Sequence, residues 1–396
     1  MSTLKVDAIR HNSATSDAIT TAADGTCTAQ ISSLNDSYIG GRRNMIINGD
    51  HRIAQRGTAA VTVTTSAQYR CVDRFKSDID GSSGGDFSHA QSTDVPAGQG
   101  FTHSSKITTV TQASKPSGTS NRHQLYTMLE KQDVAHLEWG TSAAKTCTLS
   151  FWVKSSVTGT YILWFRHYGG TTHSYYTNYT INSANTWEKK TITITGYTSN
   201  GNVSGTTDQG ILIEWNLGTS SGNETGTLNE WTTSGTIRAA SGSVYLPENA
   251  GATWYLTGCQ FEVGSVMTPF EHRSIEEELA RCQRYCEVIT HEQSGQRIAL
   301  GHSEGNNVSE NFYPTKQVMR AIPTYTFSGS ENRRVYERGA AIPDVSACIV
   351  EYSSTCYVQF GVTVAATQLT NGYANVMYWN GAPATPPAKM ILSAEL

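Results

Sequence analysis

The chain has 396 residues, of which 38% are hydrophobic and only 16% are charged, and its formal net charge is -4. This length fits two or three domains, and the small negative charge argues against a nucleic-acid-binding protein, which normally carries a strong basic excess. Ser, Thr, Gly and Asn take the place of charges, and with 19 Tyr and 8 Trp residues this composition is typical of an all-β protein.

The sequence shows neither a membrane span nor a secretion signal. No apolar run approaches the ~18 residues that a membrane-spanning helix needs. The first residues, MSTLKVDAIRHNSATSD, lack a basic segment followed by an apolar segment. We therefore expect folding in a cytoplasm without membrane insertion, where the eight cysteines, none in a CxxC pair, stay reduced and mostly buried.

Residues 1–43 are predicted to form a separate attachment arm. LKVDAIR is a short β-like run, NSATSD is a turn signal, and AITTAADGTCTA is a second weak strand. The arm is too small and too polar to bury a core of its own, so it must pair with another surface. The residues expected to contact that surface or a neighbouring subunit are Leu4, Val6, Ile9, Arg42 and Arg43.

Residues 44–273 are predicted to form a jelly roll or β-sandwich. Short apolar runs alternate with Gly, Ser and Asn clusters and show almost no helical period, which favours stacked sheets. We expect MIIN to enter the domain as a strand and NGD to turn the chain. In GILIEWNLG, residues 211, 213, 215 and 217 share one face of a strand, whereas residues 212, 214 and 216 share the other.

One segment, residues 274–289, is predicted to be a connecting α-helix. Ser274 and Glu277 form a capping box, and three Glu residues occupy the first turn, where the helix dipole favours anions. Two interpretations remain open, because such a helix either docks on a sheet or meets its symmetry copies. The apolar seam on which both depend consists of Ile275, Leu279, Cys282, Cys286 and Ile289.

Residues 290–396 again read as strands between turns and are predicted to form a second, smaller β-sandwich. Runs such as SACIVEY, TCYVQFGVTV and YANVMYW carry this pattern. The Pro-rich stretch NGAPATPPAK is short, so we expect a loop before a last strand.

The chain contains none of the common catalytic motifs. GxSxG, HExxH, a P-loop and a helix-leading GxGxxG are all missing. His167 and His173 flank a glycine turn without further metal ligands, so we expect no metal, no cofactor and no enzymatic activity. A polysaccharide hydrolase stays open as an alternative, since paired carboxylates can come from distant strands. The acids nearest to an aromatic-rich stretch are Asp208, Glu214, Glu224 and Glu230.

Residues 161–179 are unusually aromatic, with five Tyr, one Trp, one Phe and two His. Ring faces flanked by Asn, Thr, His and Arg suit carbohydrate binding, because the C–H face of a sugar stacks on a ring while polar groups bind its hydroxyls. The alternative is that these rings fill a sandwich core or a subunit interface. Base stacking is disfavoured by the missing basic charge. The candidate glycan-binding residues are Trp164, Tyr168, Tyr175, Tyr176 and Tyr179.

Several segments carry a family resemblance. LKVDAIR, RNMIINGDHRIAQRGT, YRCVDRF, WYLTGCQFEVGSVMTPFEHRSIEEELARCQRYCE and the closing ILSAEL resemble bacteriophage tail-fibre proteins of the marine phage and cyanophage type. The middle part is similar to carbohydrate-binding-module-like jelly rolls, in which the NGD segment and the GCQFEVG strand pair at one edge. Some such jelly rolls hold a structural calcium, but no compact acidic loop here supports one.

The resemblance implies a homotrimeric virion protein. Its N-terminus would dock on the phage tail through an adaptor or nozzle-type protein, and its distal part would bind polysaccharide or lipopolysaccharide of the host. We expect the protein to be made in the host bacterial cytoplasm and to reside in the virion tail. The alternatives are a polysaccharide depolymerase and a purely structural tail or connector component without receptor binding.

Overall fold

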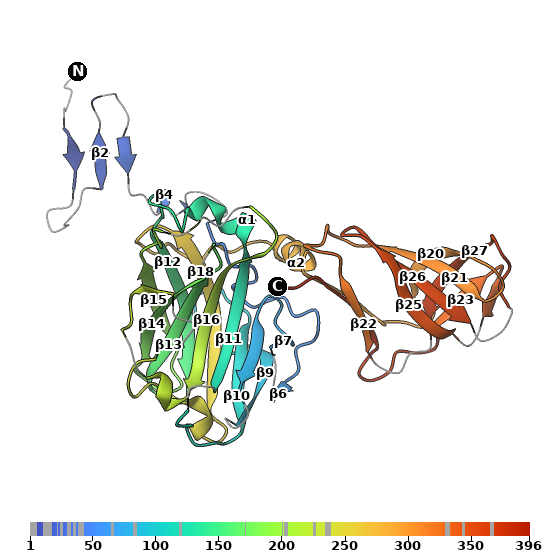
Figure 1. Cartoon of the computed structure of the whole chain (residues 1–396), viewed down its shortest axis with the longest axis horizontal. Helices are drawn as coiled ribbons and strands as arrows, with labels where there is room; N and C mark the ends of the chain where they lie inside the picture. Colours follow the sequence, from blue (N-terminus) through green and yellow to red (C-terminus); the bar gives the residue numbers. More distant parts are fainter. Residues whose placement is uncertain are drawn as a thin grey trace.

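The computed structural model describes residues 6–10, 18–21, 23, 27–29, 33–34, 37–38, 43–64, 67–81, 85–118, 121–170, 172–199, 201, 205–224, 227–233, 239–328, 333–342, 345–364 and 368–396. The chain is almost entirely β-structure, which confirms the expected fold class (Figure 1). Within these ranges, no helix is long and apolar enough to cross a membrane.

The arm contains short antiparallel strands. β1 (Ala8–Ile9), β2 (Ile19–Thr21) and β3 (Cys27–Ala29) form one small sheet, which Figure 1 shows standing apart from the first sandwich. β4 (Ser33–Leu34) and β5 (Ser37–Tyr38) form a separate pair. The second weak strand that the sequence predicts is therefore a hairpin of two strands, β2 and β3.

The first sandwich consists of two antiparallel sheets. The six-stranded sheet has the order β15 (Glu188–Ile194), β12 (Cys147–Ser155), β18 (Thr253–Val263), β10 (Ser104–Thr111), β9 (Asp86–Ser92) and β6 (Val61–Val63). The seven-stranded sheet has the order β17 (Trp231–Thr232), β14 (His173–Ile181), β13 (Gly159–His167), β16 (Gln209–Thr219), β11 (Arg122–Glu130), β8 (Lys76–Asp80) and β7 (Gln68–Tyr69). Consecutive elements alternate between the sheets in several places, as in other jelly-roll-like sandwiches.

The core of this sandwich follows from strand alternation. Ile211, Ile213, Trp215 and Leu217 of β16 are fully buried between the sheets, as their spacing predicts. Trp215 packs edge-on against Phe151 of β12, with ring centroids 5.7 Å apart. Large aromatic side chains from both sheets therefore interdigitate and fix the spacing of the layers.

The second sandwich is smaller. Its seven-stranded sheet has the order β24 (Ala340–Ile342), β23 (Arg333–Glu337), β27 (Ala374–Trp379), β20 (Arg297–Ser303), β21 (Val308–Pro314), β26 (Tyr357–Val364) and β25 (Val345–Ser353). Its three-stranded sheet has the order β19 (Cys286–Thr290), β28 (Lys389–Ser393) and β22 (Thr324–Ser328). A separate hydrophobic core, with Trp379, Phe360 and Met390 fully buried, lies between these sheets.

Two α-helices occur among the described residues, α1 (Lys131–Val134) and α2 (Ile275–Gln283). The capping box at the start of α2 is confirmed, because the backbone N–H of Glu277 donates to Ser274 Oγ at 3.1 Å. The prediction of helix up to residue 289 is wrong beyond Gln283. Residues from Cys286 onward pair with β28, and the β-branched run Val288–Thr290 favours that extended conformation.

The MIIN segment is also corrected, since residues 45–48 form a bend and a turn rather than a strand. The segment does lie beside β18, as the resemblance implies, although β18 is an inner strand of its sheet. The N–H of Met45 donates to the carbonyl of Phe261, and the N–H of Cys259 donates to the carbonyl of Gly49. A side chain at Gly49 would place its Cβ 2.1 Å from the carbonyl oxygen of Cys259, so only glycine permits this approach.

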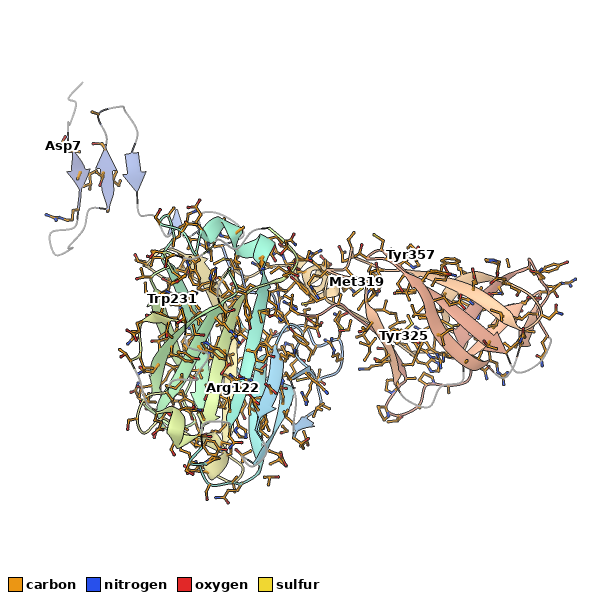
Figure 2. All side chains as sticks on the ribbon, in the orientation of Figure 1. Asp7, Arg122, Trp231, Met319, Tyr325 and Tyr357 are labelled. Atoms are coloured by element: carbon orange, nitrogen blue, oxygen red, sulfur yellow. The ribbon has the colours of Figure 1, made fainter. Side chains whose placement is uncertain are left out.

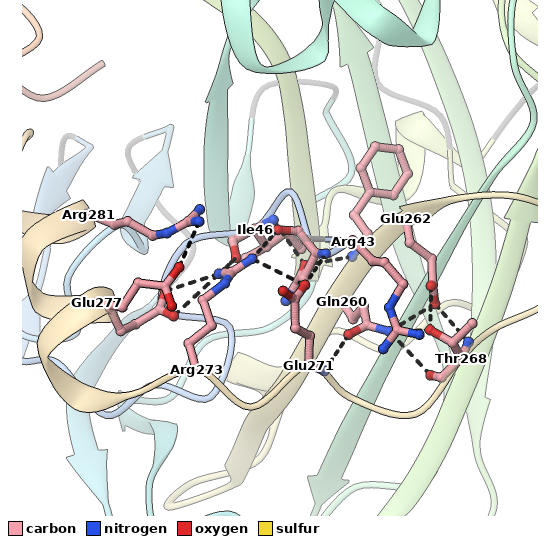
Figure 3. Close-up of polar contacts among 12 residues, drawn as sticks. Arg43, Ile46, Gln260, Glu262, Thr268, Glu271, Arg273, Glu277 and Arg281 are labelled. Atoms are coloured by element: carbon pink, nitrogen blue, oxygen red, sulfur yellow. Dashed lines mark hydrogen bonds and ion pairs between the residues drawn. The ribbon is translucent and has the colours of Figure 1, made fainter. Parts of the chain in front are cut away.

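A buried polar network ties this entry segment to the linker before α2 (Figure 3). Arg273 Nη1 donates to the carbonyl of Ile46 at 3.3 Å and pairs with Glu278 at 3.3 Å, and its Nη2 donates to the carbonyl of Asn44. Glu278 in turn accepts from the N–H of Asn48. The side chains of Arg273 and Glu278 are 3% and 4% exposed, so each charge depends on the other.

The two sandwiches are joined by charged contacts near residues 394–396. Figure 1 places this end of the chain between the sandwiches, beside α2. The carboxylate of Glu395 pairs with Arg74 and, at 3.3 Å, with Arg56 of the first sandwich. Arg284, just after α2, forms two hydrogen bonds of 2.9 Å to the fully buried carboxylate of Glu130.

The domain limits predicted at residues 43, 273 and 289 stay a prediction.

We expect Arg273→Met to lower the free energy of unfolding by about 3–5 kcal/mol, because Glu278 would keep a buried charge without its partner. Arg281→Met is the matched control, since its pair with Glu277 is an exposed contact within one helix turn and contributes less than about 1 kcal/mol. Urea unfolding of both variants measures the difference. Equal losses in the two variants would contradict a stabilising role of the buried network.

Candidate functional site

The five predicted aromatic residues lie on opposite faces of the seven-stranded sheet of the first sandwich. Tyr175 and Tyr179 point into the inter-sheet core, where Trp254 Nε1 donates to the Tyr179 hydroxyl at 3.2 Å. Trp164, Tyr168 and Tyr176 gather on the other face, which we call the outer face. These three lie outside the inter-sheet core, on the side of the sheet that faces away from the six-stranded sheet.

The strand register aligns side chains of the outer face in rows across the sheet. Because residues directly opposite each other on neighbouring strands share a face, each row joins four or five strands. The central row is Lys76, Tyr126, Glu214, Trp164 and Tyr176. A row on one side of it is Asp78, Gln124, Asn216, Ile162 and Asn178, and the row on the other side is Met128, Leu212, Arg166 and Ser174.

Aromatic and cationic groups stack along these rows. Trp164 and Tyr176 lie nearly parallel, with ring centroids 5.5 Å apart and an interplanar angle of 11°. The guanidinium of Arg122 lies 5.0 Å from the Trp164 ring, and that of Arg166 lies 5.0 Å from Tyr168. Figure 2 shows Arg122 on the first sandwich, over the strands of this sheet. The outer face thus combines ring surfaces with hydrogen-bond donors.

Several buried polar atoms of the outer face lack a hydrogen-bond partner within the protein. They are Arg122 Nε, Gln124 Oε1, Trp164 Nε1, Arg166 Nε and Glu214 Oε2. A buried polar atom without a partner costs about 1–3 kcal/mol, so such atoms are rare in proteins and normally bind ordered water or a ligand. Their concentration on one face marks it as the strongest candidate site.

Glu214 has an altered acidity in this environment. Burial raises the pKa of its carboxyl to about 7, although the positive charge of Arg122 and a hydrogen bond from Asn216 Nδ2 at 3.1 Å to its Oε1 oppose the shift. Burial also raises the pKa of Asp78, to which Gln124 donates a hydrogen bond. Near neutral pH, Glu214 can therefore either donate or accept a hydrogen bond.

A covering segment, defined as residues 227–230 and 239–240, lies on the outer face beside the edge strand β17. The N–H of Asn229 donates to the carbonyl of Tyr176 at 2.7 Å, and Thr177 Oγ1 donates to Asn229 Oδ1 at 2.7 Å. Leu228 and Ala239 pack against the rings of the face. As a result Trp164 and Tyr176 are only 4% and 1% exposed.

Two cavities adjoin the outer face where the two sandwiches meet. One, of about 470 Å³, is lined by Tyr168, Lys131, Asp208, Gln209 and Arg320 among others. The other, of about 640 Å³, includes Ala67 and Lys76 in its wall. Ala67 and Leu396 pack against the apolar part of the outer face and also line the larger cavity, so cavity and face are continuous.

The residues expected to dock on the tail are placed separately from this site. Val6 and Ile9 of the arm are 41% and 53% exposed. Arg43 is half-buried and donates to the carbonyl of Pro269 at 3.3 Å, so it contributes to the junction near α2. Leu4 and Arg42 lie outside the described residues.

The sequence pointed to the rings but not to the polar groups of the outer face. The sequence predicts Glu214 as a candidate hydrolase carboxylate on one strand face, and it does not identify Arg122, Gln124 or Arg166. The alternation in HQLYTMLE and GILIEWNLG could have placed Gln124 and Glu214 on one face. That these residues are neighbours across the sheet follows only from the register between β11, β16 and β13.

Comparisons with known proteins give weak similarities. No protein-family model and no curated protein matches the chain. The enzymatically active domain of tailspike protein 4 from Bacteriophage CBA120 is 11% identical with a TM-score of 0.29, and the match covers 56% of this chain and 21% of that chain.

Two binding modules are similar to the same degree. A family 11 carbohydrate-binding module of a cellulosomal cellulase from Clostridium thermocellum is 12% identical with a TM-score of 0.25, covering 53% of this chain and 99% of that chain. A xylan-binding domain from Paenibacillus barcinonensis is 12% identical with a TM-score of 0.23, covering 54% and 100%. The β-sandwich assignment therefore rests on the sheet order and the two hydrophobic cores described above.

The raised pKa of Glu214 predicts a pH-dependent stability. The folded chain binds the proton more tightly than the unfolded chain, whose ordinary pKa is 4.5, so stability falls as pH rises from 4.5 through 7. We expect Glu214→Gln to gain up to about 3 kcal/mol relative to the unmodified protein between pH 5 and pH 8. Urea unfolding at both pH values measures the gain.

Glu224→Gln is the control, because Glu224 is bound by Lys115 and lies away from the outer face. It should show no gain with rising pH. An equal pH dependence of Glu214→Gln and the unmodified protein would contradict the assigned environment of Glu214.

Proposed function

We propose that this protein is a glycan-binding adhesion subunit of a bacteriophage tail fibre and that it is not an enzyme. The observation that carries the proposal is the outer face, where ring surfaces and buried polar atoms without protein partners occur together. The tail-fibre assignment is supported by the segments that resemble such proteins. The host ligand in this proposal is a surface polysaccharide or lipopolysaccharide.

The chemistry of the outer face suits a sugar. A pyranose presents apolar C–H groups on its faces and hydroxyl groups around its rim, so it needs both rings and hydrogen-bond partners. Trp164 Nε1 and Arg166 Nε can donate, whereas Gln124 Oε1 and Glu214 Oε2 can accept. Ordered water can form hydrogen bonds with these atoms in the free protein, and sugar hydroxyls can replace that water.

Access to the outer face depends on the covering segment. Its described contacts with β14 include one backbone hydrogen bond, one side-chain hydrogen bond and the packing of small apolar side chains, and the chain then continues into β17, which pairs with β14. Irregular chain outside a strand ladder opens at lower cost than the paired strands below it. We propose that the covering segment moves aside when a glycan binds, while β13, β14 and β16 keep the binding residues in place.

The arm fits the proposed assembly. Val6 and Ile9 of the arm are exposed, and its three-stranded sheet has too few residues to bury a core of its own. Pairing with a neighbouring subunit or with a tail protein would cover these side chains. We therefore propose a homotrimer that docks on the tail through the arm and resides in the virion after synthesis in the host cytoplasm.

One observation favours a second candidate function, a polysaccharide depolymerase. A buried carboxyl with a pKa of about 7, such as that of Glu214, is suited to general acid catalysis. Release of oligosaccharides from capsule or lipopolysaccharide, and its loss in Glu214→Gln, would establish this activity. Intact polysaccharide after prolonged incubation would exclude it for the tested substrate.

We expect Trp164→Phe and Arg166→Met to weaken glycan binding about tenfold or more, because each removes a donor worth 1–3 kcal/mol from the outer face. Binding is measured on an array of bacterial capsular polysaccharides and lipopolysaccharides. Trp187→Phe is the matched control, since Trp187 contacts Lys154 and Tyr255 of the other sheet. Unchanged binding by both outer-face variants would contradict the assigned site.

The proposed assembly has its own test. Native mass spectrometry of the full chain should give three times the mass of 43.0 kDa. Val6→Asp combined with Ile9→Asp should shift the population toward monomer, because charged side chains disfavour burial in an interface. A stable monomer of the unmodified chain would contradict the homotrimer.

A further inference from the structure

The larger cavity between the sandwiches has an unusual distribution of charge. It has a volume of about 640 Å³, and its walls come from strands β6, β7 and β8 on one side and from β22 and β28 on the other. Three cationic side chains, Arg56, Arg70 and Lys76, line it together with one carboxylate, Glu395. Glu395 is already paired with Arg56 and with Arg74 behind the wall.

Lys76 is a cation of this cavity without a direct ion pair among the described residues. Its Nζ lies 5.3 Å from the centre of the Tyr69 ring and 5.8 Å from that of Tyr126. None of the hydrogen bonds and ion pairs among the described residues involves this Nζ. Burial lowers the pKa of Lys76, although the carboxylates of Asp78 and Glu395 oppose the shift. A half-buried ammonium of this kind gains stability when an anion approaches it.

The remaining side chains of the cavity wall are uncharged, and Val61, Ala67, Ile391 and Leu396 make part of it apolar. Gln68, Thr324, Thr326 and Ser393 contribute amide and hydroxyl groups, and Tyr69 contributes a ring. Thr324 Oγ1 donates to the carbonyl of Ser393 at 3.1 Å, which leaves its lone pairs available to accept. Donors, acceptors and a ring around an anion site match a charged sugar better than a bare inorganic ion.

The cavity also extends the outer face. Lys76 is opposite Tyr126 in the strand register, and Tyr126 begins the row that continues to Glu214, Trp164 and Tyr176. A chain of sugars on the outer face would therefore reach the cavity at the β8 end of that row. Strands lie about 4.8 Å apart, so Lys76 and Trp164 are separated by three strand spacings, or roughly 14 Å.

We propose that this cavity binds the anionic group of an acidic sugar, a carboxylate or a phosphate, with Lys76 as its counter-ion. The inference deepens the proposed glycan-binding function and names its ligand class as acidic glycans. The second sandwich takes part in recognition through Thr324, Thr326 and Ser393, so the complete site requires both sandwiches.

The test uses the full chain and isothermal titration with three probes: a galacturonic acid oligosaccharide, glucose 6-phosphate and a neutral galactose oligosaccharide. We expect Lys76→Met to reduce the affinity for at least one acidic probe tenfold or more. Lys76→Arg should restore most of that affinity, and neither variant should change binding of the neutral probe. The first two probes distinguish a carboxylate from a phosphate ligand.

Three results would overturn the inference. They are the absence of binding of both acidic probes to the unmodified protein, equal binding of those probes by Lys76→Met, and a loss of neutral-probe binding in the same variant. Thermal unfolding without ligand separates a structural role, because Lys76→Met should unfold at an equal or higher temperature if the ammonium awaits a ligand. A lower temperature would assign Lys76 to packing on Tyr69 and Tyr126 instead.

These outcomes are separable from those for the outer face. Trp164→Phe and Arg166→Met change no residue in the wall of the larger cavity. If those two variants keep full glycan affinity, the outer-face assignment fails. The result for Lys76 alone decides whether the larger cavity binds an anion.

Discussion

The arrangement of the molecule depends on one buried carboxylate, that of Glu395. Arg56 and Arg74 of the first sandwich bind it directly, while Arg320 of the second sandwich holds the backbone carbonyls of Ala394 and Glu395 at 2.7 Å and 2.9 Å. The ring of Tyr285 covers the guanidinium of Arg74 at 3.4 Å. Because Glu395 lines both cavities between the sandwiches, the shape of each cavity follows from this contact.

The outer face and the larger cavity form one continuous surface, but different interactions hold the two parts in place. Rigid, paired strands align Tyr126, Glu214 and Trp164, so their spacing is set by the sheet. The cavity, in contrast, exists only because two separate cores are held together by charged contacts. Recognition that combines both parts would sense the relative position of the sandwiches, whereas recognition by the outer face alone would not.

The all-β class, both sandwiches and the capped start of α2 could be predicted, because period-2 alternation and capping are local properties of the sequence. The end of α2 could not, since the residues from Cys286 onward pair with β28, about 100 residues later in the chain. Likewise the aromatic segment 161–179 was recognised, but alternation alone does not say which of its faces meets the core. Only the packing of β12 and β18 against one face of the sheet puts Tyr175 in the core and leaves Trp164 on the outer face.

The contact between Arg284 and Glu130 has a consequence for the ionic environments that the protein can tolerate. Salt weakens exposed ion pairs over a Debye length of about 10 Å at 0.1 M, but it acts much less on buried pairs. The carboxylate of Glu130 is fully buried and receives both hydrogen bonds from one planar guanidinium, so dissolved cations compete poorly for it, whereas Arg284 itself is 28% exposed. This contact between the two sandwiches should therefore lose less strength in concentrated salt than an exposed ion pair would.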